Sequence, residues 1–210
     1  DIVTGVKFSN AGQICVAPNR VFVAENVKEK FTEKVVSRAK AALVGFDKNK
    51  DITTGPVIDK RACERIKGLI KDAVMNGAKL LVGGNRPKYL KKGYYISPTI
   101  LCDVTEEMQV YQQETFGPIV SLISFSEETN LLNMANDCDE GGLTAYIFTT
   151  NQSRAEFYAS KLRYGEIQIN GVKYDIDLPH GGIGQSGIGH DCSSLALQDY
   201  LIQKRITCSN

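Results

Sequence analysis

The sequence predicts an α/β fold, in which strands and helices alternate and the strands form a largely parallel sheet flanked by helices. Short segments rich in Val, Ile and Phe predict strands over residues 20–24, 79–82, 94–101, 119–125, 145–149 and 165–170. Between them, apolar residues recur at helical spacing over residues 27–44, 60–76, 127–136 and 153–162. Regular structure fades over residues 171–194, where a functional loop is expected.

The helix boundaries follow from capping residues. Asn26 is expected to cap the first long helix, and Asp59 the second, which Gly77 ends. After residue 194, a short helix and an extended tail are predicted. We therefore expect one main domain over residues 1–194, which bears Cys15, and a helix/strand tail over residues 195–210.

Composition excludes several partner classes. The chain has 210 residues and a net charge of +1, which gives no reason to expect nucleic acid or an acidic membrane surface as a partner. No apolar run reaches the roughly 20 residues that cross a bilayer, and no secretory signal is seen. A cytoplasmic protein is expected, and the basic loop over residues 85–92 is interpreted as solvated surface.

The six cysteines are too widely spaced for a CxxC metal or redox unit. They are Cys15, Cys63, Cys102, Cys138, Cys192 and Cys208, of which the nearest two lie sixteen residues apart. No metal site is predicted, and reduced thiols are expected. For five of them the default is a small buried apolar side chain.

Cys15 differs, because it ends a Gly-Gln turn just before a predicted strand. Gly12 lets the chain turn tightly, so backbone N–H groups around Cys15 could converge on whatever the sulfur attacks. Such positive potential is what makes a thiol nucleophilic. From these residues alone, Cys15 could be either a nucleophile or an inert cysteine.

Five segments resemble motifs of the NAD(P)-dependent aldehyde dehydrogenase family, in the family's order along the whole chain. The segment F-S-N-A-G-Q-I-C at residues 8–15 resembles its cysteine signature, and E-T-F-G-P at residues 114–118 its E-x-F-G-P motif. The other three are P-T-I at residues 98–100, G-L-T-A at residues 142–145 and P-H-G-G-I-G-Q-S-G-I-G at residues 179–189.

The resemblance implies a role for each matched residue. Cys15 would attack an aldehyde carbonyl, and the resulting thioester would be hydrolysed. NAD or NADP would be the cofactor, with Glu114 on the nicotinamide ribose and Phe116 beside the nicotinamide. Asn10, Asn170, Tyr174 and His180 would line or shape the substrate pocket. From the residues alone, Glu114 could instead be a solvated carboxylate, and the two asparagines turn residues.

The sequence also departs from the family pattern. Only fourteen residues precede Cys15, so the upstream general base, the second oxyanion donor and the cofactor domain are expected to be absent. Gly184 replaces a lysine, and His180 a phenylalanine. The chain alone is therefore expected to be inactive, and a separate cofactor-domain polypeptide could complete it.

Residues 198–201, Q-D-Y-L, are similar to the succinate-semialdehyde and lactaldehyde dehydrogenase branch. Ser9 stands where true succinate-semialdehyde enzymes often have a carboxylate-binding arginine, so a small polar or hydroxy-aldehyde is expected as substrate. Family members are dimers or tetramers, and a homo-oligomer is expected. The alternatives are a stand-alone thiol esterase or acyl-transfer protein and a non-catalytic subunit. The CoA-acylating branch stays open, although the Gly-Gly-x-x-x-Ser-Gly segment favours hydrolysis.

Overall fold

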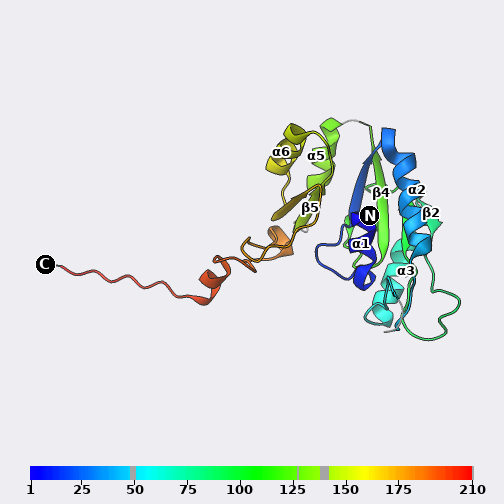
Figure 1. Cartoon of the computed structure of the whole chain (residues 1–210), viewed down its shortest axis with the longest axis horizontal. Coiled ribbons are helices and arrows are strands. Elements are labelled where there is room, and N and C mark those ends of the chain that lie inside the picture. Colours follow the sequence, from blue (N-terminus) through cyan, green and yellow to red (C-terminus); the bar gives the residue numbers. More distant parts are fainter. Residues whose placement is uncertain (48–50, 127, 138–141, 210) are drawn as a thin grey trace. The chain divides into compact units, whose positions relative to one another are not determined.

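A computed structural model describes residues 1–47, 51–126, 128–137 and 142–209. The chain divides into two compact units, Asp1–Leu131 and Leu132–Asn210 (Figure 1). Each contains helices and parallel strands, which confirms the predicted α/β class. Cys138 and the expected helix start at Glu127 lie outside the described residues.

The first unit is built on a four-stranded, mostly parallel sheet. Its strand order is β1-β4-β3-β2. β4 (Ile119–Phe125) pairs in parallel with β1 (Arg20–Ala24) and with β3 (Thr99–Cys102), whereas β2 (Lys79–Val82) is antiparallel to β3. Residues 94–98 were expected to be extended and form no strand, because Pro98 has no N–H for a ladder; β3 begins directly after it.

Four helices accompany this sheet: α1 (Ile2–Phe8), α2 (Glu25–Ala41), α3 (Lys60–Met75) and the one-turn α4 (Gln109–Gln112). Figure 1 shows α1 and α2 beside β1 and β4. The core cluster joins both helices to the sheet, with Phe8 from α1, Val35 from α2 and Leu122 from β4 all buried. Helix α1 thereby leads from the core directly into the Cys15 loop.

One predicted cap is confirmed and the other is wrong. The Asp59 side chain accepts a hydrogen bond from the N–H of Ala62 at 2.7 Å and caps α3. Asn26, in contrast, lies inside α2, because β1 runs straight into the helix and Ala24 occupies the N-cap without a side-chain bond. The strand end therefore fixes where α2 begins.

The second unit contains a separate two-stranded parallel sheet, formed by β5 (Thr144–Ile147) and β6 (Glu166–Ile169). Helix α6 (Gln152–Lys161) connects them, and α5 (Glu128–Asn136) precedes them. The later residues are irregular apart from two short 3₁₀ helices, η2 (Gly184–Ser186) and η3 (Ala196–Tyr200). This confirms the loss of regular structure expected over residues 171–194.

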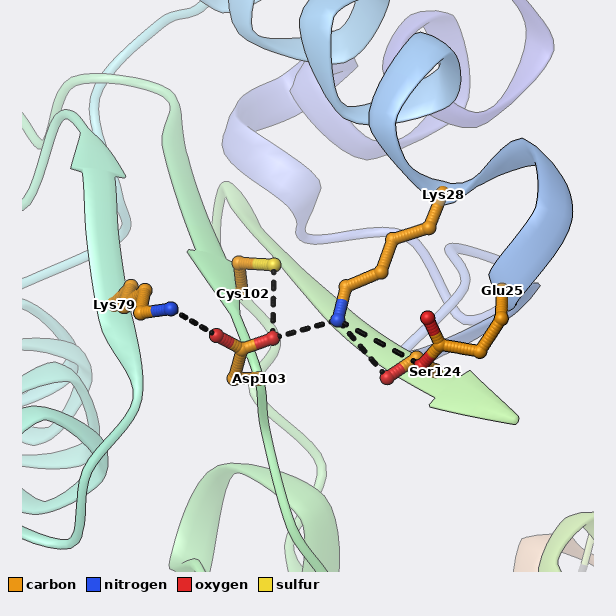
Figure 2. A network of polar contacts seen from close by, with 6 residues as sticks. All are labelled: Glu25, Lys28, Lys79, Cys102, Asp103 and Ser124. Atoms are coloured by element: carbon orange, nitrogen blue, oxygen red, sulfur yellow. Dashed lines mark hydrogen bonds and ion pairs between the residues drawn. The ribbon is translucent and has the colours of Figure 1, made fainter. Parts of the chain in front are cut away.

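A cluster of charged side chains fastens α2 and β2 to the end of β3 (Figure 2). Asp103 lies between two lysines, with Oδ1 2.8 Å from Lys28 Nζ and Oδ2 2.9 Å from Lys79 Nζ. Lys28 also donates to Ser124 Oγ at 3.1 Å. The two lysine hydrogen bonds hold the pKa of Asp103 down at about 2, whereas burial raises the pKa of the neighbouring Cys102 thiol. Cys102 is buried, in agreement with the expectation of a small apolar core side chain.

Replacing Asp103 with asparagine is expected to lower the free energy of unfolding at pH 7 by about 1 kcal/mol, allowing for solvent screening of a partly exposed group. Asparagine tolerates the left-handed backbone of this residue, whose φ is 58°, so the change removes charge and little else. The stabilisation is present above the ordinary pKa of 3.8 and is lost as the pH falls through about 2.

Urea unfolding at pH 7 and at pH 2 measures this effect. Glu29→Gln, which removes an exposed carboxylate from α2, is the matched control and should change little. A loss of equal size at pH 7 and pH 2 would contradict the assignment to charge.

Candidate active site

Cys15 follows a tight left-handed loop at the end of α1. The loop contains the 3₁₀ turn η1 (Ser9–Gly12), in which Asn10, Ala11 and Gly12 all have positive φ, at 47°, 54° and 71°. The thiol beyond it is exposed and free. Among the described residues, no acceptor takes the Cys15 N–H. The loop thus presents a thiol and an open backbone donor together.

Gln13 holds this loop in place from both sides. Its Nε2 donates to the carbonyl of Asn10 at 2.9 Å and to that of Pro56 at 3.3 Å, and its Oε1 accepts the N–H of Ile58 at 2.8 Å. Asn10 Nδ2 in turn donates to the carbonyl of Gln13 at 3.0 Å. The Asn10 amide is therefore used within the loop, in agreement with the turn-residue alternative.

Gly12 brings the loop against the segment that carries Glu114 and Phe116. A Cβ atom on Gly12 would lie 2.2 Å from the carbonyl oxygen of Gly117 and 2.8 Å from that of Lys7. Only glycine permits this approach at a positive φ. The contact joins two of the motifs found in the sequence, although about a hundred residues separate them.

Side chains alternate between solvent and core along residues 114–116. Glu114 and Phe116 are exposed, and Thr115 between them is fully buried. Arg65 of α3 donates to the carbonyls of Glu114 and Thr115, at 2.9 and 2.6 Å, and Asn19 Oδ1 accepts the N–H of Thr115 at 2.7 Å. The segment is therefore held by its backbone, which leaves the carboxylate and the aromatic ring directed outward.

Beneath this segment lies a buried lysine. Lys7 is 1% exposed, and its Nζ donates to Thr115 Oγ1 at 2.9 Å. Burial lowers the pKa of Lys7 to about 7, and the Glu114 carboxylate opposes that shift. A pKa this far below the usual value is uncommon for lysine and follows from the burial of the amine.

The other predicted site residues belong to the second unit. Asn170 follows β6 and exchanges two hydrogen bonds with the backbone of Thr149, at 2.8 and 2.9 Å, so its amide ties the ends of the two strands together. His180 Nδ1 lies 2.9 Å from the Glu166 carboxylate, and the His180 backbone pairs with that of Asp191. Tyr174 is 65% exposed.

The structure thus brings the Cys15 loop against the Glu114–Phe116 segment and shows supporting residues that the sequence analysis missed. No sequence motif marks these supporting residues, which are Lys7, Arg65, Asn19 and Glu166. Lys7 adjoins the cysteine signature, but a single lysine at a helix end is usually solvated. Only its burial reveals it.

The match to known proteins is extensive. A model of the aldehyde dehydrogenase family matches residues 1–206. The chain is a member of the aldehyde dehydrogenase family. This confirms the resemblance carried by the five motifs.

Its relatives include enzymes of the expected branch. The chain is 38% identical over 202 residues to succinate-semialdehyde dehydrogenase [NADP(+)] 2 of Schizosaccharomyces pombe. The aligned region is 96% of the chain and 41% of that enzyme. It is 36% identical over 196 residues to 3-sulfolactaldehyde dehydrogenase of Pseudomonas putida, covering 93% and 40%. Among solved structures, an aldehyde dehydrogenase from Brucella melitensis biovar abortus 2308 matches with a TM-score of 0.88 and 38% identity, covering 94% of the chain and 40% of that protein.

The chain therefore spans about 40% of the length of the relatives that it matches. In the part of the chain that the structure describes, no helix has the length and apolar character to cross a membrane. Within that part, no three metal-binding side chains gather.

Proposed function

We propose that this aldehyde dehydrogenase family member supplies the nucleophile and part of the cofactor site for NAD(P)-dependent oxidation of an aldehyde to a carboxylic acid. The observation that carries the proposal is the Cys15 loop. It combines an exposed thiol with a backbone N–H that has no acceptor among the described residues, and it packs against the segment bearing Glu114 and Phe116.

The chemistry follows from these groups. The Cys15 thiolate forms a C–S bond to the aldehyde carbon. The carbonyl oxygen becomes an oxyanion, which accepts a hydrogen bond from the Cys15 backbone N–H. Loss of hydride from that carbon leaves a thioester. Water then adds to the thioester carbon, the C–S bond breaks, and the carboxylate and the Cys15 thiolate are released together with protons.

The exposed groups fit the nicotinamide riboside part of NAD(P). The Glu114 carboxylate is an acceptor for ribose hydroxyls, and the Phe116 ring, 39% exposed, offers a face for the nicotinamide. When bound, NAD(P)+ supplies the acceptor for the departing hydride. We assign Tyr174 and His180 to the aldehyde pocket and Asn10 and Asn170 to supports that shape it.

We propose a small polar aldehyde as the substrate. The relatives named for succinate semialdehyde and sulfolactaldehyde support a short polar aldehyde, and Ser9, which is exposed, offers a hydroxyl and no cation for a substrate carboxylate. For assembly, we propose a homo-oligomer that uses the tail over residues 195–210, in which Leu201, Ile202 and Ile206 are exposed.

The test is NAD(P)H formation from short aldehydes, by the 210-residue chain alone and by the chain joined to the cofactor-binding part of a relative. The completed enzyme should oxidise hydroxy-aldehydes to acids, and the chain alone should not. Turnover of p-nitrophenyl esters by the chain alone, with no aldehyde oxidation after completion, would instead support the thiol esterase.

Replacing Glu114 with glutamine should raise the KM for NAD(P) about tenfold in the completed enzyme, because the neutral amide is a weaker acceptor than the carboxylate for ribose hydroxyls. The KM for the aldehyde should change less than twofold. Steady-state kinetics with each substrate varied in turn measure both values. Glu106→Gln, at an exposed carboxylate outside the motif, is the control; an equal effect there would remove Glu114 from the cofactor site.

A further inference from the structure

The buried amine of Lys7 has no role in the steps above, and its position calls for one. Lys7 is in the last turn of α1, one residue before the cysteine signature, and its hydrogen-bond acceptor Thr115 lies between Glu114 and Phe116. This side-chain hydrogen bond therefore links the residue that precedes the cysteine signature to the E-x-F-G-P motif, across 108 residues of sequence.

Packing alone does not account for a lysine at this position. A fully buried amine is costly in an apolar interior, and an apolar side chain of similar length would fill the same volume without that cost. What the amine adds is a donor for the Thr115 hydroxyl and a partial positive charge that interacts with Glu114.

The Lys7–Thr115 hydrogen bond lies beside the close approach of Gly12 to Gly117, so both contacts bear on the relative position of the two motifs. The Gly12 backbone touches Gly117, and the carbonyl of Lys7 is itself among the atoms around Gly12. A shift of Thr115 therefore moves Glu114 and Phe116 relative to the Cys15 loop.

We propose that Lys7 is a positioning residue, whose side-chain amine holds the Glu114–Gly117 segment in register with the Cys15 loop through the Thr115 hydroxyl. The register itself is a property of the fold. Its consequence, alignment of the cofactor ribose with the nucleophile, rests on the proposed function.

The first experiment uses the 210-residue chain and requires no turnover. Hydrogen exchange is measured at two reporter amides, Gln13 N–H, bonded to the Asn10 carbonyl, and Thr115 N–H, bonded to Asn19. Lys7→Met should speed exchange at both about fivefold, as expected for loss of one buried hydrogen bond. Its global unfolding free energy should change little, because removal of the buried amine and loss of its bond to the Thr115 hydroxyl act in opposite directions.

Two further variants isolate the bond. Thr115→Val removes the acceptor at nearly constant volume and should reproduce the exchange rates of Lys7→Met, while the double variant should add nothing further. Lys67→Met, at an exposed position on α3, controls for the change of residue type.

A pH profile separates this role from simple packing. The exchange ratio of wild type to Lys7→Met should change across pH 7, where the amine titrates. The charged groups around it are the Glu114 carboxylate and Arg65, which donates to the Glu114 and Thr115 carbonyls. Unchanged exchange in Lys7→Met, or an increase spread evenly over the whole first unit, would overturn the proposal.

Kinetics of the completed enzyme test whether the position of the Glu114–Gly117 segment relative to the Cys15 loop affects cofactor binding. Lys7→Met should raise the KM for NAD(P) about fivefold, with a smaller change in kcat. If Cys15 proves dispensable, the proposed function fails, and the exchange measurements still decide the role of Lys7.

Discussion

Replacing Cys15 with alanine is expected to lower aldehyde oxidation by the completed enzyme at least about a thousandfold, because the proposed mechanism forms its C–S bond through this thiol. The side chain is exposed, so its truncation should leave the unfolding free energy unchanged. NAD(P)H formation and urea unfolding, measured on the same preparation, separate loss of chemistry from loss of fold.

Cys208 provides a matched control for this prediction. It is also a free, exposed thiol, and it lies in the irregular C-terminal tail. Cys208 is not one of the exposed apolar residues proposed for assembly, Leu201, Ile202 and Ile206, so Cys208→Ala should retain full activity. Activity surviving in Cys15→Ala, or an equal loss in both variants, would show that Cys15 is not the nucleophile.

The second large effect concerns Gly12. An alanine there must adopt a φ of 71° and place its Cβ 2.2 Å from the Gly117 carbonyl oxygen. The left-handed backbone costs roughly 1–2 kcal/mol, and the collision with rigid backbone adds about 1–3 kcal/mol. The free energy of unfolding should therefore fall by about 3 kcal/mol, as measured by urea unfolding.

Gly77 separates these two costs. Its φ is 103°, and an added Cβ would meet nothing within 4 Å. Gly77→Ala should thus cost only about 1 kcal/mol, the backbone contribution. If the two variants lose the same stability, the close approach of Gly12 to Gly117 does not constrain the fold.

Strands marked by short apolar runs were the most predictable part of this fold. β1, β2 and β4 have the predicted bounds, since such runs between turn residues favour extended structure. The start of α2 was not predictable from Asn26, because the preceding strand sets it. The separation of β5 and β6 into a sheet of their own depends on tertiary packing, which local patterns do not encode.

The candidate site was predictable to the extent that it consists of motifs. Cys15, Glu114 and Phe116 were found through the family's segments, and the structure adds that the loop and the segment touch. Lys7 and Arg65 could not be found, because each reads as a solvated cation until the fold shows its partners. Asn10 and Asn170 were predicted to shape the substrate pocket, whereas the backbone hydrogen bonds that their amides make were not predicted.

The contacts that shape the Cys15 loop also determine when the loop can form. Gln13 depends on Pro56 and Ile58, and Gly12 depends on Gly117, all of which are synthesised after the cysteine. Long-range contacts of this kind form late in folding. The contacts that hold the Cys15 loop are therefore incomplete until residue 117 has been synthesised.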